Sequence, residues 1–249
     1  MILATDIGEW SPGWRDILSL PLDAIPVRDR VVVRGVSMLA RSRIARIKGL
    51  EHVLSDRDPF ILAVNHSTKL EAVLLPAMLM LLRRGRHVHF FADWNFRLIP
   101  GLNLMFRCAR VITVPNKEAK PRFLNVLKPL YVSDVPPMEE ARRRLAAGRP
   151  VGIFPEGTVN RNRTHLMRGR LGAARLSLET GVPIVPAGLR YLNAPAHGLI
   201  PEGSPVEIEF GPAMRPPAGI DVTDWHNDIM TAIGTLSHKI PTSGRGDDA

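Results

Sequence analysis

The sequence predicts one α/β domain with a largely parallel central sheet flanked by helices, preceded by an amphipathic helical arm. One pattern in the sequence leads to this fold class. Short apolar runs with the length of buried strands alternate along the chain with longer segments that have helical periodicity. Strands that alternate with helices pair mainly in parallel. We expect the arm at residues 1–47, the domain at 48–240 and a disordered tail at 241–249.

Residues 1–27 combine tryptophans and leucines with prolines, which predicts a short amphipathic arm with turns. The next segment, 28–47, alternates arginines with aliphatic residues, and only Asp29 opposes its positive charge. A basic amphipathic helix of this kind is typical of a membrane surface. A solvated helix face packed on the core explains the same pattern equally well.

The remaining elements follow from apolar runs and from the residues that interrupt them. Glycines after two of the helical segments, at 148 and 181, are typical helix ends. We expect strands at 60–64, 87–92, 110–114, 151–154, 183–189 and 206–210, the last at a sheet edge, and helices at 72–82, 100–108, 120–131, 138–147, 171–180 and 221–240.

Composition restricts the class of partner. The chain has 249 residues, 45% of them hydrophobic, and a formal net charge of +9. The hydrophobic content is enough for a packed core, and the charge favours nucleic acid, acidic lipid surfaces or phosphorylated substrates. No aromatic-basic motif or helix-turn-helix pattern supports the first of these, so we expect no nucleic-acid partner.

Features related to cellular location agree with one another. Charged residues interrupt the first 22 positions, unlike a signal peptide, and no apolar run approaches the roughly 20 residues needed to span a bilayer. Cys108 is the only cysteine, which excludes an internal disulfide and favours a reducing compartment. We therefore expect a cytoplasmic protein, peripheral on the inner face of the membrane.

The most informative stretch runs from Asn65 to Glu71, directly after the expected strand 60–64. Polar residues at the carboxyl end of a buried strand lie where open α/β sheets bind ligands. His66 is a candidate general base, since only histidine titrates near neutrality without help. Across a strand-to-helix turn, Glu71 can fold back onto the imidazole. A lone histidine before an apolar helix is more often structural, and this stretch alone does not exclude that.

A second polar cluster, Glu156-Gly157-Thr158, follows the strand 151–154. Gly157 permits close approach of the backbone to a ligand, while Glu156 and Thr158 can bond hydroxyl groups. The residues behind it are strongly basic, with no acid between the first and last of the following arginines: Arg161, Arg163, Arg168, Arg170 and Arg175.

Taken in order, His-x4-acid, Phe-Pro-Glu-Gly-Thr and Val-Pro-Ile-Val-Pro resemble the glycerolipid acyltransferase family typified by 1-acylglycerol-3-phosphate acyltransferases. The resemblance covers roughly residues 48–215. It implies transfer of a fatty acyl group from acyl-CoA or acyl carrier protein to a hydroxyl of a lysolipid-like acceptor in phospholipid biosynthesis. It also implies contact with membrane lipids, and neither a metal nor a cofactor besides the donor substrate.

The resemblance also assigns roles to residues. His66 would take the proton of the acceptor, and Glu71 would orient the imidazole. The substrate-binding residues would be Asn65, Glu156, Gly157, Thr158, Arg161 and Arg170, the last standing where the family usually has a lysine.

Three of the motifs depart from the family pattern. Glu71 replaces the usual aspartate, and Val159 replaces an arginine, with Arg161 two residues later. Asp93 and Asn116 stand where the second motif of the family carries cations that help to hold an acceptor phosphate. We therefore expect an acceptor other than lysophosphatidate, unless the arginines between 161 and 175 bind the acceptor phosphate in place of the missing cations.

Competing functions are less well supported. Cys108 as an acyl-carrying nucleophile is disfavoured by its apolar neighbours, which predict a buried structural thiol. A serine hydrolase would need a Gly-x-Ser-x-Gly elbow, which the sequence lacks. The altered motifs leave one serious alternative, a catalytically impaired lipid- or acyl-binding relative of the same fold.

Overall fold

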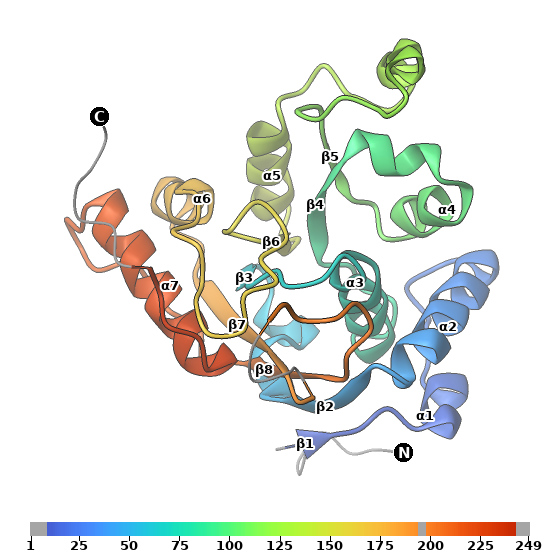
Figure 1. Ribbon diagram of the computed structural model, residues 1–249, viewed down its shortest axis with the longest axis horizontal. Coiled ribbons are helices and arrows are strands. Elements are labelled where there is room, and N and C mark those ends of the chain that lie inside the picture. The colour runs from blue at the N-terminus through green and yellow to red at the C-terminus, as the bar shows by residue number, and fades with distance from the viewer. Residues whose placement is uncertain (1–8, 194–197, 243–249) are drawn as a thin grey trace.

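An eight-stranded sheet with the order β1-β2-β8-β7-β3-β6-β4-β5 forms the centre of the molecule (Figure 1). This computed structural model describes residues 9–193 and 198–242. The strands are β1 (Glu9–Trp10), β2 (Ile44–Lys48), β3 (Ile61–Val64), β4 (His89–Asp93), β5 (Ile112–Val114), β6 (Val151–Ile153), β7 (Ile184–Tyr191) and β8 (Val206–Phe210).

Helices surround the sheet. The α-helices are α1 (Trp14–Ser19), α2 (Val27–Arg41), α3 (Glu71–Leu82), α4 (Pro100–Cys108), α5 (Pro137–Ala146), α6 (Gly172–Thr180) and α7 (Val222–Ser237). The 3-10 helices are η1 (Leu50–His52), η2 (Ser55–Arg57), η3 (Trp94–Leu98) and η4 (Arg122–Leu130).

The central strands are parallel. β3 pairs in parallel with both β6 and β7, and β4 pairs in parallel with β6 and β5. β8 runs antiparallel to β7, and β1 runs antiparallel to β2. The predicted α/β class with a largely parallel sheet is therefore confirmed, and helices are present at the N-terminal end of the described chain.

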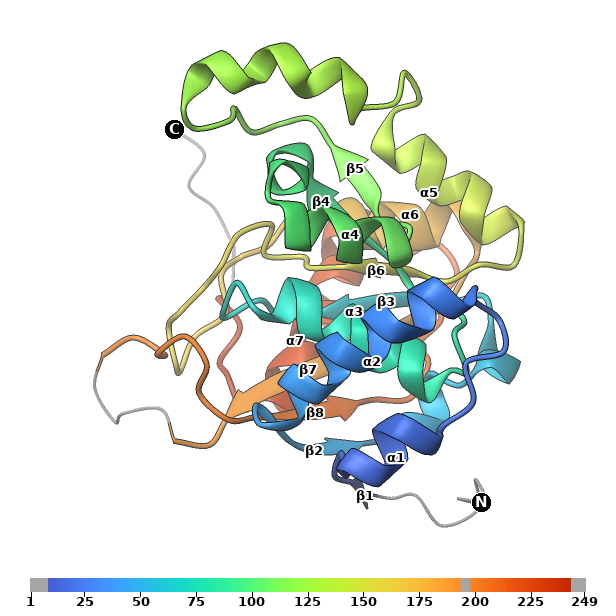
Figure 2. The same ribbon diagram turned by 90° about the vertical axis from the view of Figure 1, so that its right-hand side faces the viewer.

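Side chains that alternate along β3 divide the core into two layers. Leu62 and Val64 belong to a cluster shared with α2, α3 and α4. Ile61 and Ala63 belong to a second cluster shared with α5, α6 and α7. Because both faces are covered by helices, every residue of β3 is buried, as expected for a central parallel strand (Figures 1 and 2).

Two sequence predictions near the N-terminal side of the sheet are wrong. The basic helix expected through residue 47 ends at Arg41, and the following residues form β2, parallel to β8. Ile44 and Ile47 are buried there, so their apolar character serves the sheet rather than a helix face. β8 in turn is not an edge strand, since it lies between β2 and β7.

Smaller differences concern segment ends. The helix expected at 120–131 is the 3-10 helix η4, bounded by Pro121 and containing Pro129, which lacks the N–H group that an α-helical ladder needs. Of the tail predicted at 241–249, residues 243–249 lie outside the described part of the chain. Within the described residues, no helix is both long enough and apolar enough to cross a membrane.

Candidate active site

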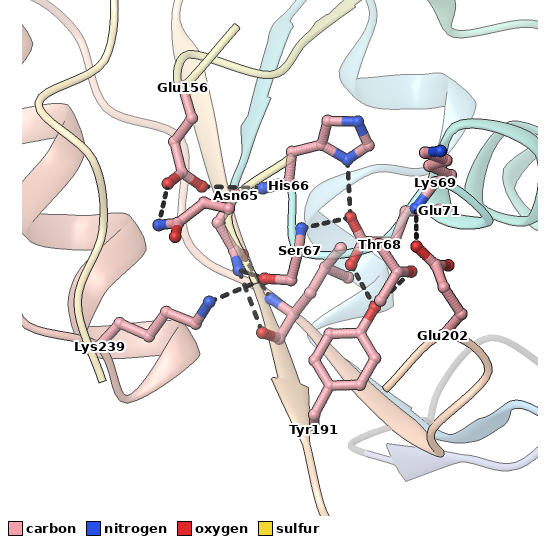
Figure 3. A network of polar contacts seen from close by, with 12 residues as sticks. Asn65, His66, Ser67, Thr68, Lys69, Glu71, Glu156, Tyr191, Glu202 and Lys239 are labelled. Atoms are coloured by element: carbon pink, nitrogen blue, oxygen red, sulfur yellow. Dashed lines mark hydrogen bonds and ion pairs between the residues drawn. The ribbon is translucent and has the colours of Figure 1, made fainter. Parts of the chain in front are cut away.

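Three neighbouring strands deliver polar side chains to one edge of the sheet. His66 follows the carboxyl end of β3, Glu156 follows that of β6, and Tyr191 is the last residue of β7. Because β3 lies between β6 and β7 and is parallel to both, these three ends are adjacent. A network of polar contacts connects them (Figure 3).

His66 and Glu71 form the centre of this network. The turn between β3 and α3 brings the imidazole Nδ1 of His66 to 2.8 Å from Oε2 of Glu71. The same carboxylate oxygen accepts a hydrogen bond of 2.8 Å from the backbone N–H of Ser67. Glu71 opens α3, where the helix dipole favours an anion. The predicted proximity of the two side chains is thus present.

This contact decides which ring nitrogen is available. When Nδ1 of a neutral imidazole donates to a carboxylate, Nε2 carries the lone pair and can accept a proton. The ring of His66 stacks on Phe154 with 4.3 Å between the ring centroids, and its side chain is 13% exposed. The histidine is therefore held in one orientation and still reaches the surface.

Tyr191 is a member of the network that the sequence did not reveal. Its hydroxyl donates to Oε1 of Glu71 and lies 3.0 Å from the hydroxyl of Thr68. Burial and the neighbouring charge of Glu71 raise the pKa of Tyr191, so the phenol stays protonated and acts as a donor. Both oxygens of Glu71 are consequently occupied by donors.

Glu156 is buried and supports the histidine turn. Its Oε1 accepts from the backbone N–H of His66 at 3.0 Å, while Oε2 accepts from Asn160 at 2.5 Å and from the N–H of Met167 at 2.9 Å. The backbone N–H of Asn160 donates to the carbonyl of His66 at 2.6 Å. These contacts position His66, and a substrate contact by Glu156 stays a prediction.

Asn65 prolongs the pairing of β3 with β7 through its side chain. Its Oδ1 accepts from the N–H of Leu189 at 2.7 Å, and its Nδ2 donates to the carbonyl of Leu189 at 3.2 Å. Asn65 is almost completely buried. The amide fixes the start of the histidine turn, and its predicted role in substrate binding has no direct counterpart among these contacts.

The Gly157 turn lies at the surface and carries a cation. Gly157 has a φ of +67°, and a Cβ there would lie 2.8 Å from Nε of Arg170, so glycine is needed for this close approach. Arg170 is exposed, as are Gly157 and Thr158. Arg161 instead donates through Nε to the carbonyl of Ile200 at 2.7 Å. Of the predicted cations, Arg170 is the one packed against the turn.

The region of the second motif contains a lysine that is not among the predicted site residues. Nζ of Lys117 lies 2.7 Å from Oδ2 of Asp93, and Asn116 directly precedes this lysine. A cation is thus present near the two departing positions, but Asp93 neutralises it.

Cys108 has the properties of a structural thiol. It is buried at the end of α4, and burial raises the pKa of the thiol to about 11. A thiol with such a pKa is almost entirely protonated at neutral pH, which disfavours a nucleophilic role. Among residues 9–193 and 198–242, no three His, Cys, Asp or Glu side chains are grouped so that they could hold a metal ion.

Comparisons with known proteins bear on the family and the fold of this chain. A family model described as "Acyltransferase" matches residues 44–190. Among solved structures, the 1-acyl-sn-glycerophosphate (LPA) acyltransferase PlsC from Thermotoga maritima is similar in fold. Its TM-score is 0.58 at 17% sequence identity, and the match covers 90% of this chain and 85% of that chain. No curated protein sequence gives a significant match.

Proposed function

Because the chain belongs to the acyltransferase family, we propose that it moves a fatty acyl group from acyl-CoA or acyl carrier protein to a hydroxyl of a lysolipid-like acceptor. The observation that carries this proposal is the 2.8 Å contact between Nδ1 of His66 and Glu71. It leaves Nε2 as a base at the edge of the sheet where substrates are expected to bind.

In the proposed reaction, the acceptor oxygen attacks the thioester carbonyl carbon while its proton moves to Nε2 of His66. The carbon–sulfur bond of the resulting tetrahedral intermediate then breaks, and the thiol of the donor leaves with that proton. Glu71 stabilises the imidazolium that forms between these two steps. Tyr191 and the N–H of Ser67 hold this carboxylate in place.

We propose an acceptor other than lysophosphatidate, such as a lysolipid with another head group. Phosphate recognition relies on charge-assisted and often bidentate contacts from cations. At the second motif, Lys117 directly follows Asn116, but its ammonium is paired with Asp93 at 2.7 Å. If the acceptor is instead lysophosphatidate, Arg170, which is exposed beside Gly157, is the cation best positioned to contact its phosphate.

The proposal includes attachment to the inner face of the membrane, through a surface that we call the apolar flank. It consists of the exposed apolar residues of α1, α2, α4 and η4. The ribbons of these four helices lie along the right-hand side of Figure 1, from η4 at the top to α1 near the bottom, and this side of the molecule faces the viewer in Figure 2. Its members, 49–77% exposed, are Trp14, Leu18, Val27, Val31, Leu39, Leu104, Phe123, Val126 and Leu130.

Cations accompany these apolar side chains. Arg28 on α2 is 81% exposed in its side chain and lies 3.4 Å from Asp29. Lys120 precedes η4, and Arg122 at the start of η4 lies 3.0 Å from Glu118. Apolar insertion and attraction to anionic lipid head groups act together at a bilayer surface. A surface of this composition therefore favours a peripheral contact with an acidic membrane.

A catalytically impaired lipid- or acyl-binding relative is the second candidate, favoured by the altered positions Asp93, Asn116 and Val159. Thioester turnover against a panel of acceptors, phosphorylated and unphosphorylated, separates the two candidates. The enzyme proposal predicts release of free thiol that depends on an acceptor and is lost in His66→Ala. Binding of acyl-CoA without turnover on any acceptor would favour the second candidate.

A further inference from the structure

A buried lysine from the C-terminal end of the domain reaches the histidine turn. Lys239 is 5% exposed, and its Nζ donates a hydrogen bond of 2.8 Å to the hydroxyl of Ser67, the residue after His66 (Figure 3). This lysine lies outside residues 44–190, to which the family model extends. Its position therefore cannot be inferred from the family match.

The backbone around Lys239 is fixed from both sides. His238 has a φ of +57° at the end of α7, and the N–H of Lys239 donates to the carbonyl of Gly234 at 2.9 Å. The next residue, Ile240, donates to the carbonyl of Thr164 at 2.7 Å and accepts from the N–H of Leu166 at 2.9 Å. The ammonium group is thus directed into the site by a rigid segment.

The charges that act on Lys239 are those of the site itself. Burial lowers the pKa of Lys239, while the negative charges of Glu156 and Glu71 oppose that effect. Both carboxylates are also buried. A buried charge is expensive unless opposite charges compensate it, and the negative charges of the two carboxylates lower this cost for the ammonium of Lys239.

We propose that Lys239 is a positioning residue for the His66–Glu71 pair, holding the Ser67 turn and offsetting the negative charge of Glu71 and Glu156. This inference rests on the proposed function. Without the ammonium charge, the potential at the imidazole becomes more negative, and the ring keeps its proton to higher pH. Less of the neutral base is then available at pH 7.

The test compares the pH dependence of kcat/KM in Lys239→Met, Lys239→Gln and Lys239→Arg. In the first two variants, the acid limb should move up by about one pH unit, so that the loss approaches about tenfold on the acid side of the profile, is smaller at neutral pH and recovers at higher pH. Lys239→Arg keeps the charge and should shift the limb much less. Arg143→Met removes an exposed cation on α5, outside the polar network of the site, and should leave the profile unchanged.

Two results would overturn the inference. One is an unchanged profile in a folded Lys239→Met or Lys239→Gln protein. The other is a loss of equal size at every pH, which a purely structural role predicts. Circular dichroism and thermal unfolding of each variant establish that it is folded.

Measurements without substrate separate this inference from the proposed function. An NMR titration of the His66 ring should show the same upward shift in Lys239→Met even if no acceptor is turned over. In the wild-type protein, ¹⁵N NMR of the lysine side chains should show a charged Lys239 at pH 7. A neutral amine there would exclude the proposed role even if no neutral variant folds.

Discussion

The phenol of Tyr191 donates a hydrogen bond to the carboxylate of Glu71, although the two residues are 120 positions apart in the chain. Tyr191 ends β7 and Glu71 begins α3, so this contact joins the sheet to the helix that follows the histidine turn. Because Glu71 bonds His66 with its other oxygen, Tyr191 affects the histidine through the carboxylate.

Tyr191→Phe should therefore lower kcat more than it raises KM. A hydrogen bond to a charged group contributes about 1.5–3 kcal/mol, so we expect a loss of about tenfold or more in kcat. Steady-state kinetics with a saturating thioester donor measure this loss. Equal activity in Tyr191→Phe and the wild type would show that Ser67 and His66 suffice to hold the carboxylate.

His66→Ala should remove the general base. General-base catalysis contributes about 10²–10⁴-fold to the rate, so turnover should fall by a factor of about 10² or more. The side chain is partly exposed and stacks on Phe154, which makes a folded variant a reasonable expectation. Acyl transfer at wild-type rate in a folded His66→Ala protein would refute the assignment.

Substitution of Glu71 tests how the His66 imidazole is oriented and stabilised, while the imidazole itself stays in place as the base. Glu71→Gln keeps the shape but removes the charge that stabilises the imidazolium, and its amide can donate to Nδ1 and favour the wrong tautomer. We expect a clear loss, smaller than that of His66→Ala. Glu71→Asp restores the usual family residue and should keep more activity than Glu71→Gln. The reverse order of these two variants would contradict a role that depends on charge.

The sequence predicted those parts of the fold and site that are encoded locally. The apolar run before Asn65 and the one before Glu156 each marked a strand with polar residues at its carboxyl end, while the pairing that makes these strands neighbours is seen only in the structure. β2 was missed because the burial of Ile44 and Ile47 depends on pairing with β8, more than 150 positions later. The same pairing makes β8 an internal strand.

Long-range contacts explain the missed site residues as well. Lys239 and Ser67 are 172 positions apart, and no local pattern marks either of them as a partner of the histidine turn. Glu156 was recognised as polar and adjacent, but its contacts with the backbone of His66 depend on how β6 lies beside β3. Strand order, which the sequence did not predict, decides such contacts.

Membrane binding should depend on both lipid charge and the apolar flank. Co-sedimentation with liposomes should rise with the fraction of anionic lipid and fall with salt, because each Lys or Arg near the surface contributes about 1 kcal/mol. Replacing Phe123 and Val126 of η4 by serine should weaken it. Leu199→Ser, at a residue that is 61% exposed and outside the flank, is the matched control.

Two outcomes would contradict this contact. Equal binding to neutral and anionic vesicles would exclude the electrostatic part. Equal losses in the η4 double variant and in Leu199→Ser would exclude the apolar flank as the specific surface. Circular dichroism of each variant shows whether a loss reflects unfolding.

Acceptor choice should follow the charges around the Gly157 turn and the second motif. If Asp93 holds Lys117 away from a phosphate, lysophosphatidate and glycerol 3-phosphate should compete weakly in the acyl transfer assay. Asn116→Arg should strengthen that competition, because a guanidinium can bind phosphate in a bidentate manner. Asp93→Asn, which releases Lys117 from its 2.7 Å ion pair, should act in the same direction.

Efficient acylation of lysophosphatidate that is abolished by Arg170→Ala or Arg161→Ala would instead mean that the phosphate site has moved to these arginines. The altered-acceptor proposal would then be wrong, while the roles of His66 and Glu71 would be unaffected.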